Sequence, residues 1–150
     1  MSSTAKNAHS AIDLLSAEFF RCVSFIAGER PDYAGIRTLF VPAGMLFKGI
    51  AVGVEATSVK EFIEPRQKSF DDGSLTEFRE TELSATTSVF GHAAQRTSHY
   101  EKAGVTGGVA FAGRGVIFTQ FVWQDVGWLM SSMAWDDERD GLALTDFSDT

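Results

Sequence analysis

Apolar residues recur at three- and four-residue steps near the start of the chain. Between Ile12 and Ile26 this spacing predicts a long amphipathic helix with one buried face, and Gly28 is typical of a helix end. Asp32 suits the N-cap of a shorter helix, which must end before Pro42 because proline has no backbone N–H to donate. The pattern therefore predicts two helices in the first forty residues.

A third helix is predicted from Ser58 onward. The Ser58-x-x-Glu61 pattern is a capping box, in which each side chain satisfies one unpaired amide at the start of a helix. Pro65 falls inside the pattern and is expected to kink or interrupt the helix, which closes with turn residues at 71–73. A short strand over residues 45–50 is predicted to separate the second helix from the third.

The second half of the chain is rich in Thr, Val, Phe, Ile and Trp, which are typical of strands. Four strands are predicted, at roughly 76–90, 93–103, 114–124 and 127–136, and the glycine-rich segment 104–113 is interpreted as a flexible loop. Short links between them favour an antiparallel meander. Helices followed by strands define an α+β class, in which the three N-terminal helices must cover one face of the sheet.

The charge of the chain is concentrated at its C-terminus. The 150 residues carry 13 Lys+Arg and 20 Asp+Glu, a formal net charge of −7, but residues 136–150 alone hold six acids and one arginine. We expect one domain over 1–150, with its core at about 8–138 and a solvated acidic tail at about 139–150. No cluster of Lys and Arg is present, which argues against a partner made of nucleic acid.

The remaining composition excludes several classes of protein. Cys22 has no second cysteine to pair with, which is consistent with a reducing compartment, and we expect a cytoplasmic protein. The sequence has no apolar run long enough for a membrane span and no start typical of a secretory signal. No spacing of His and Cys predicts a metal site, and no motif implies a cofactor.

Five segments carry a resemblance to a known family. In order after the long first helix they are 36–47, 90–94, 98–101, 114–117 and 132–138. Together they resemble the nuclear transport factor 2-like superfamily, with its SnoaL-like and ketosteroid-isomerase-like enzymes, over about residues 8–138. The resemblance implies a cystatin-like α+β cone, in which a strongly curved antiparallel sheet wraps three helices and encloses a pocket. It also implies a homodimer formed through the outer face of the sheet.

The family's isomerases use acid/base residues in that pocket. The resemblance places their tyrosine near Arg21, their aspartate base near Lys48, and their second aspartate near Thr119 or Gln120. A lysine cannot abstract a proton at neutral pH unless its pKa is lowered by several units. The isomerase mechanism is therefore not carried over, although Lys48 remains a candidate catalytic residue.

Two histidines loosely match the histidine pair of related dehydratases. His92 and His99 are seven residues apart, which places them on opposite faces of one extended strand. His92 is interpreted as a turn residue. His99 can titrate near neutral pH and is kept as a candidate catalytic residue, beside the alternative that it is structural.

Strand alternation predicts a set of ligand-binding residues. Arg96, Ser98 and Tyr100 share one face of their strand, and Arg114 and Gln120 share one face of the next. If both faces line the pocket, polar groups lie among apolar walls, and Tyr100 can donate to a developing oxyanion. The alternative is that both arginines lie on the outer face beside acids or at a dimer contact. The candidate ligand-binding residues are Arg96, Ser98, Tyr100, Gln120 and Ser132.

Two functions are consistent with these residues. The first is a small-molecule-binding protein of the SnoaL-like type whose ligand is hydrophobic or anionic. The alternative is an isomerase, dehydratase or cyclase that needs no cofactor and uses acid/base chemistry in the same pocket. Alternating apolar residues on the last two strands predict that both sheet faces are buried, the outer one against a second copy of the chain.

Overall fold

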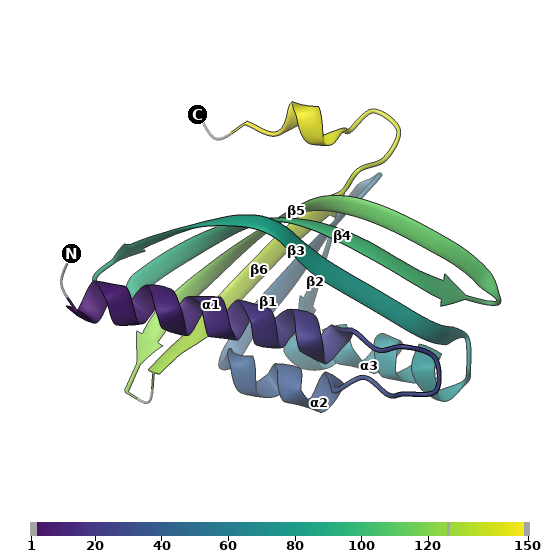
Figure 1. Ribbon diagram of the computed structural model, residues 1–150, viewed down its shortest axis with the longest axis horizontal. Coiled ribbons are helices and arrows are strands. Elements are labelled where there is room, and N and C mark those ends of the chain that lie inside the picture. Colours follow the sequence, from purple (N-terminus) through teal and green to yellow (C-terminus); the bar gives the residue numbers. More distant parts are fainter. Residues whose placement is uncertain (1–2, 126, 149–150) are drawn as a thin grey trace.

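A long first helix crosses the concave side of a curled sheet in the computed structural model (Figure 1). The structure describes residues 3–125 and 127–148. The helices are α1 (Ser3–Val23), α2 (Tyr33–Ile36), the 3-10 turn η1 (Arg37–Leu39) and α3 (Val59–Asp71). The strands are β1 (Phe40–Ile50), β2 (Gly53–Ser58), β3 (Leu75–Phe90), β4 (Ala93–Thr106), β5 (Val109–Gln124) and β6 (Gly127–Asp137). A second 3-10 turn, η2 (Leu144–Asp146), follows the sheet.

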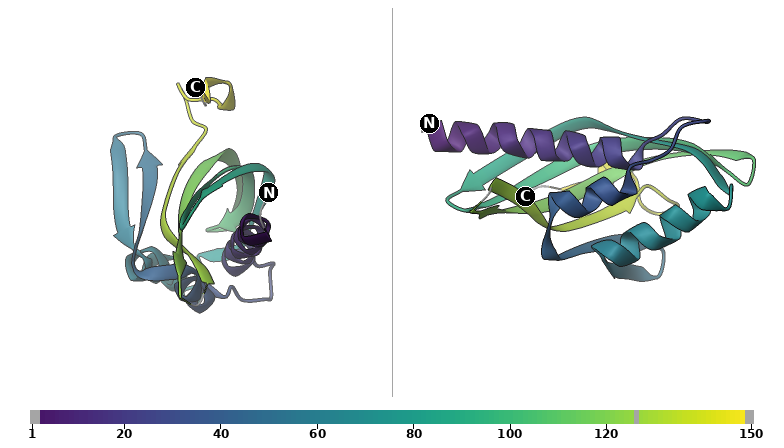
Figure 2. Two further views of the ribbon diagram at one scale, coloured as in Figure 1. Left: turned by 90° about the vertical axis from the view of Figure 1, so that its left-hand side faces the viewer. Right: turned by 90° about the horizontal axis from the view of Figure 1, so that it is seen from below.

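The local signals for the helices are confirmed. The Asp32 side chain accepts a hydrogen bond from the Gly35 amide at 3.1 Å and caps α2. At α3, the Glu61 amide donates to the Ser58 hydroxyl at 3.1 Å, and the Ser58 amide donates to the Glu61 carboxylate at 2.9 Å. The predicted interruption at Pro65 is wrong, because α3 continues through it as one helix. All three helices lie on one side of the sheet (Figure 2), so the α+β prediction is confirmed.

The sheet is mixed, which corrects the prediction of a purely antiparallel one. Its strand order is β2-β1-β6-β5-β4-β3, and β1 pairs with β6 in parallel while every other pair is antiparallel. Short links determine the direction of neighbours in sequence, but no link constrains strands as distant in sequence as β1 and β6. Strand β2, which forms a hairpin with β1, was not predicted from the sequence.

The hairpin between β4 and β5 is much longer than the sequence predicted. The expected loop at 104–113 is wrong: β4 continues to Thr106, β5 begins at Val109, and only Gly107 and Gly108 make the turn. Both glycines have positive φ, 57° and 76°, as a two-residue type I′ turn requires. Gly104 lies inside β4, where a Cβ would come within 2.6 Å of the Phe111 ring on β5.

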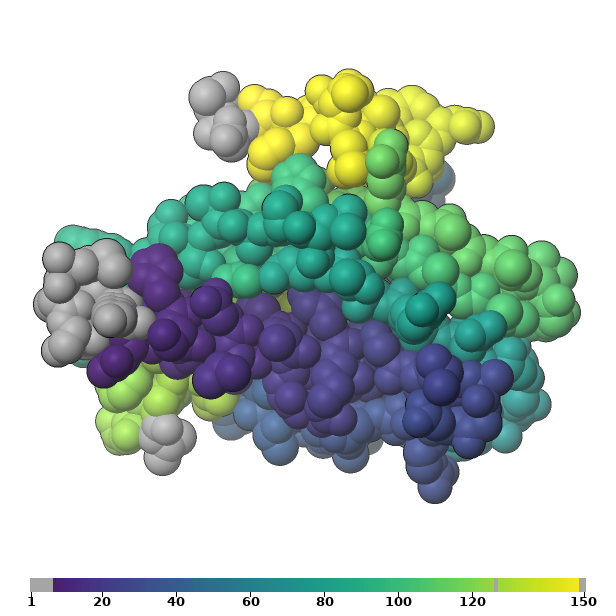
Figure 3. All heavy atoms as spheres, viewed as in Figure 1, coloured from purple at the N-terminus to yellow at the C-terminus, as the bar shows by residue number. Residues whose placement is uncertain are grey.

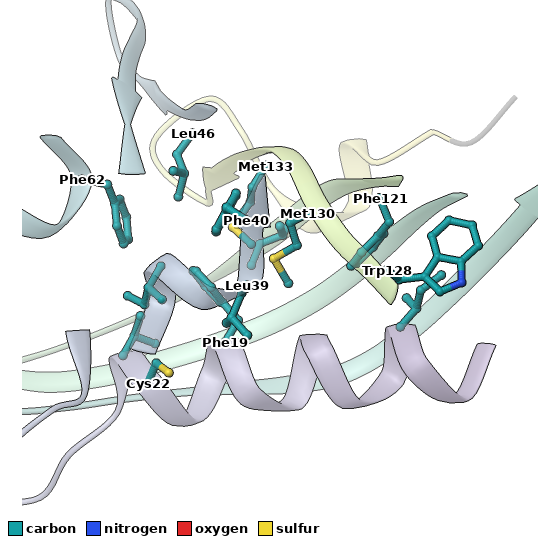
Figure 4. Packing of buried hydrophobic residues seen from close by; sticks show 14 of the residues in the cluster. Phe19, Cys22, Leu39, Phe40, Leu46, Phe62, Phe121, Trp128, Met130 and Met133 are labelled. Atoms are coloured by element: carbon teal, nitrogen blue, oxygen red, sulfur yellow. The ribbon is translucent and has the colours of Figure 1, made fainter. Parts of the chain in front are cut away.

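The core fills the space between the helices and the concave face of the sheet. Phe19 of α1 and Leu39 of η1 pack with Met130 and Met133 of β6 (Figure 4). Cys22 is also buried there as a free thiol. No described helix is both long enough and apolar enough to cross a membrane.

The chain after β6 returns over the outer face of the sheet, opposite the helices (Figure 3). We call residues 138–147 the C-terminal strap. The acidic tail was expected to be solvated, and Asp140 is exposed, but the Phe147 ring stacks on Phe118 of β5 with 6.2 Å between centroids. Asp140 and Asp146 of the strap are exposed as predicted, whereas Phe147 packs on the sheet. Residues 149 and 150 lie outside the described part.

Candidate functional site

A cavity of about 270 Å³ lies between the helices and the concave face of the sheet. α1, α2 and α3 contribute one wall, and strands β1, β3, β4, β5 and β6 contribute the other. Most of the lining is apolar and aromatic, with a few ionisable groups, which is the usual make-up of a small-molecule site. The lining residues are Phe19, Val23, Tyr33, Lys48, Phe62, Arg66, Leu75, Phe78, Glu80, Lys102, Phe111, Ile117, Met133 and Trp135.

Arg66 brings a positive charge from α3 into this cavity. Its guanidinium lies 3.7 Å from the centroid of the Phe62 ring, and Nη1 donates to the Phe62 carbonyl at 2.8 Å. Burial lowers the pKa of Arg66, an effect that nearby Tyr33 and Glu80 oppose. No carboxylate of the described residues lies within 4.0 Å of it, so its charge has no direct counter-ion.

Glu80 is the one acidic residue of the described lining. It lies on β3 directly across from Lys102 of β4. Burial raises its pKa from 4.5 to about 7, although Lys102 and Arg66 oppose the rise and Asp137 adds to it. Its carboxyl group accepts no hydrogen bond from a described residue. A partly protonated carboxyl group at neutral pH can both accept and release a proton.

Lys102 is held in place by a pair of residues outside the lining. Its Nζ lies 2.6 Å from one Asp137 carboxylate oxygen, and the Tyr100 hydroxyl donates to the other. The same hydroxyl lies 3.3 Å from the Asp136 carbonyl. Burial and the Asp137 carboxylate raise the pKa of Tyr100, which is fully buried. Tyr100 therefore keeps its proton for Asp137 and orients Lys102 through it.

Two predicted ligand-binding residues instead form an ion-pair network that ties α1 to the sheet. Arg96 donates to both carboxylate oxygens of Glu82, at 2.7 and 3.1 Å, and to Asp13 at 2.6 Å. The Ser98 hydroxyl donates to Glu82 at 2.6 Å. Neither Arg96 nor Ser98 lines the cavity. Their polar groups are satisfied within the protein, and their role in ligand binding stays a prediction.

The outer face of the sheet holds three further candidates. Gln120 is exposed and opposes Gln95 of β4 and Ser132 of β6. His99 is half-buried, with its ring edge-on to Phe147 of the strap at 5.1 Å. The structure therefore does not bring Gln120, Ser132 or His99 to the cavity.

Of the proposed catalytic and binding residues, Lys48 alone lines the cavity. Three charged lining residues, Arg66, Glu80 and Lys102, were not predicted from the sequence. Lys102 continues the alternating inward series of β4 beyond Tyr100, and Glu80 lies on β3 two positions after inward-facing Phe78, so alternation could have found both. Arg66 has no such signal, because a single arginine on a helix resembles a solvated residue.

No family model matches the sequence, and no curated protein matches it. Solved structures do. A nuclear transport factor 2-like protein from Salmonella enterica aligns with a TM-score of 0.75 at 11% identity, over 96% of this chain and 99% of that one. A nuclear transport factor 2-like protein with a cystatin-like fold from Novosphingobium aromaticivorans gives 0.71 at 16%, over 93% and 87%. LinA gives 0.74 at 9%, over 90% and 88%.

These similarities establish the fold of this chain as that of the nuclear transport factor 2-like proteins, and they confirm the fold that the sequence resemblance implied.

In the described part of the chain, no three His, Cys, Asp or Glu residues gather as metal ligands would.

Proposed function

We propose that this protein binds a small, largely apolar molecule with one anionic group in the cavity between its helices and sheet. The main support for an anionic ligand is Arg66, a desolvated cation with no carboxylate partner among the described residues. A half-buried charge without a counter-ion is costly, and a ligand carboxylate would supply the missing charge-assisted hydrogen bonds. The aromatic walls would bury the rest of the ligand.

The other charges of the lining support an anionic ligand. Lys48 also lacks a carboxylate within 4.0 Å among the described side chains. Lys102 is paired with Asp137 outside the lining, so three cations face a single carboxyl group in the cavity. That group, Glu80, is neutral in part at pH 7 because burial raises its pKa to about 7.

A second candidate function is proton transfer without a cofactor, as in an isomerase, dehydratase or cyclase. The observation that favours it is Glu80, whose pKa of about 7 suits a general acid or base at neutral pH. Arg66 and Lys48 could then stabilise a developing oxyanion. Replacing Glu80 by glutamine separates the two functions, because binding survives in either case, whereas turnover is lost if Glu80 transfers the proton.

The test of binding uses 2-naphthoate as a probe, titrated calorimetrically at pH 6. We expect Arg66→Met to weaken binding at least tenfold, since a hydrogen bond to a charged group contributes about 1.5–3 kcal/mol. Lys60→Met is the matched control, because Lys60 is an exposed cation on the same helix. Thermal unfolding of each variant checks that the fold is retained.

A neutral probe, 2-naphthalenemethanol, completes the design. We expect it to bind more weakly than 2-naphthoate to the wild type and equally to the wild type and Arg66→Met. Equal affinity of the wild type for the two probes, or unchanged 2-naphthoate binding by Arg66→Met, would contradict the proposed function.

A further inference from the structure

The C-terminal strap is fixed to the outer face of the sheet by specific contacts. The Phe147 ring stacks on Phe118 and meets the edge of His99. Glu138 lies 2.6 Å from the Arg114 guanidinium and accepts a hydrogen bond from the Leu144 amide at 2.7 Å. These contacts hold the strap against the outer face of the sheet.

A second cleft, of about 360 Å³, lies between the strap and the outer face of the sheet. Its floor comes from β1, β2, β5 and β6, and its other wall is the strap. The lining is largely apolar, and its large apolar members include Phe47, Val54, Phe118, Leu144 and Phe147. This cleft lies on the opposite face of the sheet from the inner cavity, and Trp135 of β6 lines both.

The charge of the cleft is opposite to that of the inner cavity. Its described lining holds four acids and no Lys, Arg or His; the acids are Asp136, Asp137, Glu138 and Asp146. The first three are paired with Arg139, Lys102 and Arg114. Asp146 accepts a hydrogen bond from the Ala143 amide but has no cation within 4.0 Å among the described residues.

We infer that this cleft binds a small organic cation, an aromatic amine whose ring packs against Phe118 and Phe147 and whose ammonium group lies beside Asp146. The aromatic side chains offer apolar area and favourable contact with a cation over their faces. The unpaired carboxylate supplies the charge complement. No residue of α1, α2 or α3 lines the cleft, so a ligand reaches it without any movement of these helices.

The test uses 2-(1-naphthyl)ethylamine as a probe, titrated into the full chain by calorimetry at pH 7. We expect Phe147→Ala to weaken binding at least tenfold, because it removes an aromatic wall, and Asp146→Asn to weaken it threefold to fivefold. Asparagine can still accept the Ala143 hydrogen bond, so this variant isolates the charge. Asp140→Asn is the control, since Asp140 is an exposed strap acid outside the lining. Arg66→Met should leave amine binding unchanged.

Three results would overturn the inference. The first is amine binding that survives Phe147→Ala. The second is amine binding lost in Arg66→Met, which would assign the probe to the inner cavity. The third is a dimer by sedimentation at micromolar concentration that Phe118→Asp dissociates and that excludes the amine, because a second copy of the chain would then occupy the outer face.

Discussion

Replacing Arg96 by alanine should destabilise the protein by about 3–5 kcal/mol in urea unfolding at pH 7, the range expected when one partner of a buried ion pair is removed. The Arg96 side chain is 10% exposed and its main partner, Glu82, is 20% exposed. Without the guanidinium, Glu82 keeps only the Ser98 hydroxyl as a partner of those described here. The remaining buried carboxylate is the reason for the large effect.

An exposed ion pair is the matched control for this variant. Arg114→Ala breaks the pair with Glu138, but Arg114 is 59% exposed, so the expected loss is below about 1 kcal/mol. A second variant, Arg96→Met with Glu82→Gln, should recover part of the loss because it removes both charges. If Arg96→Ala costs no more than Arg114→Ala, the network has no structural role.

Glu80→Gln should stabilise the protein by about 3 kcal/mol at pH 8 and by less than about 1 kcal/mol at pH 5. The folded pKa of Glu80 is about 7, against 4.5 for the ordinary side chain. A raised acidic pKa means that the unfolded state loses its proton first as pH rises. The wild type therefore loses stability progressively between about pH 4.5 and 7, by about 1.4 kcal/mol for each pH unit. Above pH 7 this loss is complete.

Urea unfolding at pH 5 and pH 8 measures this difference. Glutamine cannot ionise, so the variant lacks this contribution to the pH dependence. Glu64→Gln is the control, because Glu64 is exposed on α3 and does not line the cavity. A Glu80→Gln variant that is less stable than the wild type at pH 8 would show that the ionised carboxylate is well accommodated in the cavity.

The helices were predictable because their signals are local. The Asp32 cap and the Ser58–Glu61 capping box join residues three positions apart, so side-chain chemistry alone determines them. The parallel pairing of β1 with β6 joins residues more than eighty positions apart, as Met45 with Ser132 shows. Such pairing depends on the packing of the whole sheet, and nothing near either strand specifies it.

One misplaced turn explains why the sequence did not show that Gln120 lies on the outer face of the sheet. If residues 104–113 were a flexible loop, the register of β4 against β5 would be undetermined. Gln120 could then be placed on the face of the sheet that lines the cavity. A two-residue turn at Gly107 and Gly108 fixes the register, which sets Arg96 opposite Thr119 and Gln120 opposite Gln95. The paired glycines were a sufficient signal for that turn.

Ligand chemistry was harder to predict than strand faces. Alternation identifies which residues of β3 and β4 point inward, but the role of Glu80 depends on its desolvation by residues from several elements. The same holds for Arg66, whose importance comes from the absence of a nearby carboxylate among the described residues. Both are properties of the assembled cavity, and they decide what it can bind.

A crystal structure of the protein with 2-naphthoate would show directly whether the inner cavity is the ligand-binding site. We predict that the naphthyl ring lies among the aromatic walls and that its carboxylate lies within hydrogen-bonding distance of Arg66. A structure in which the probe is bound at another place, while the inner cavity is filled by ordered water, would contradict the account.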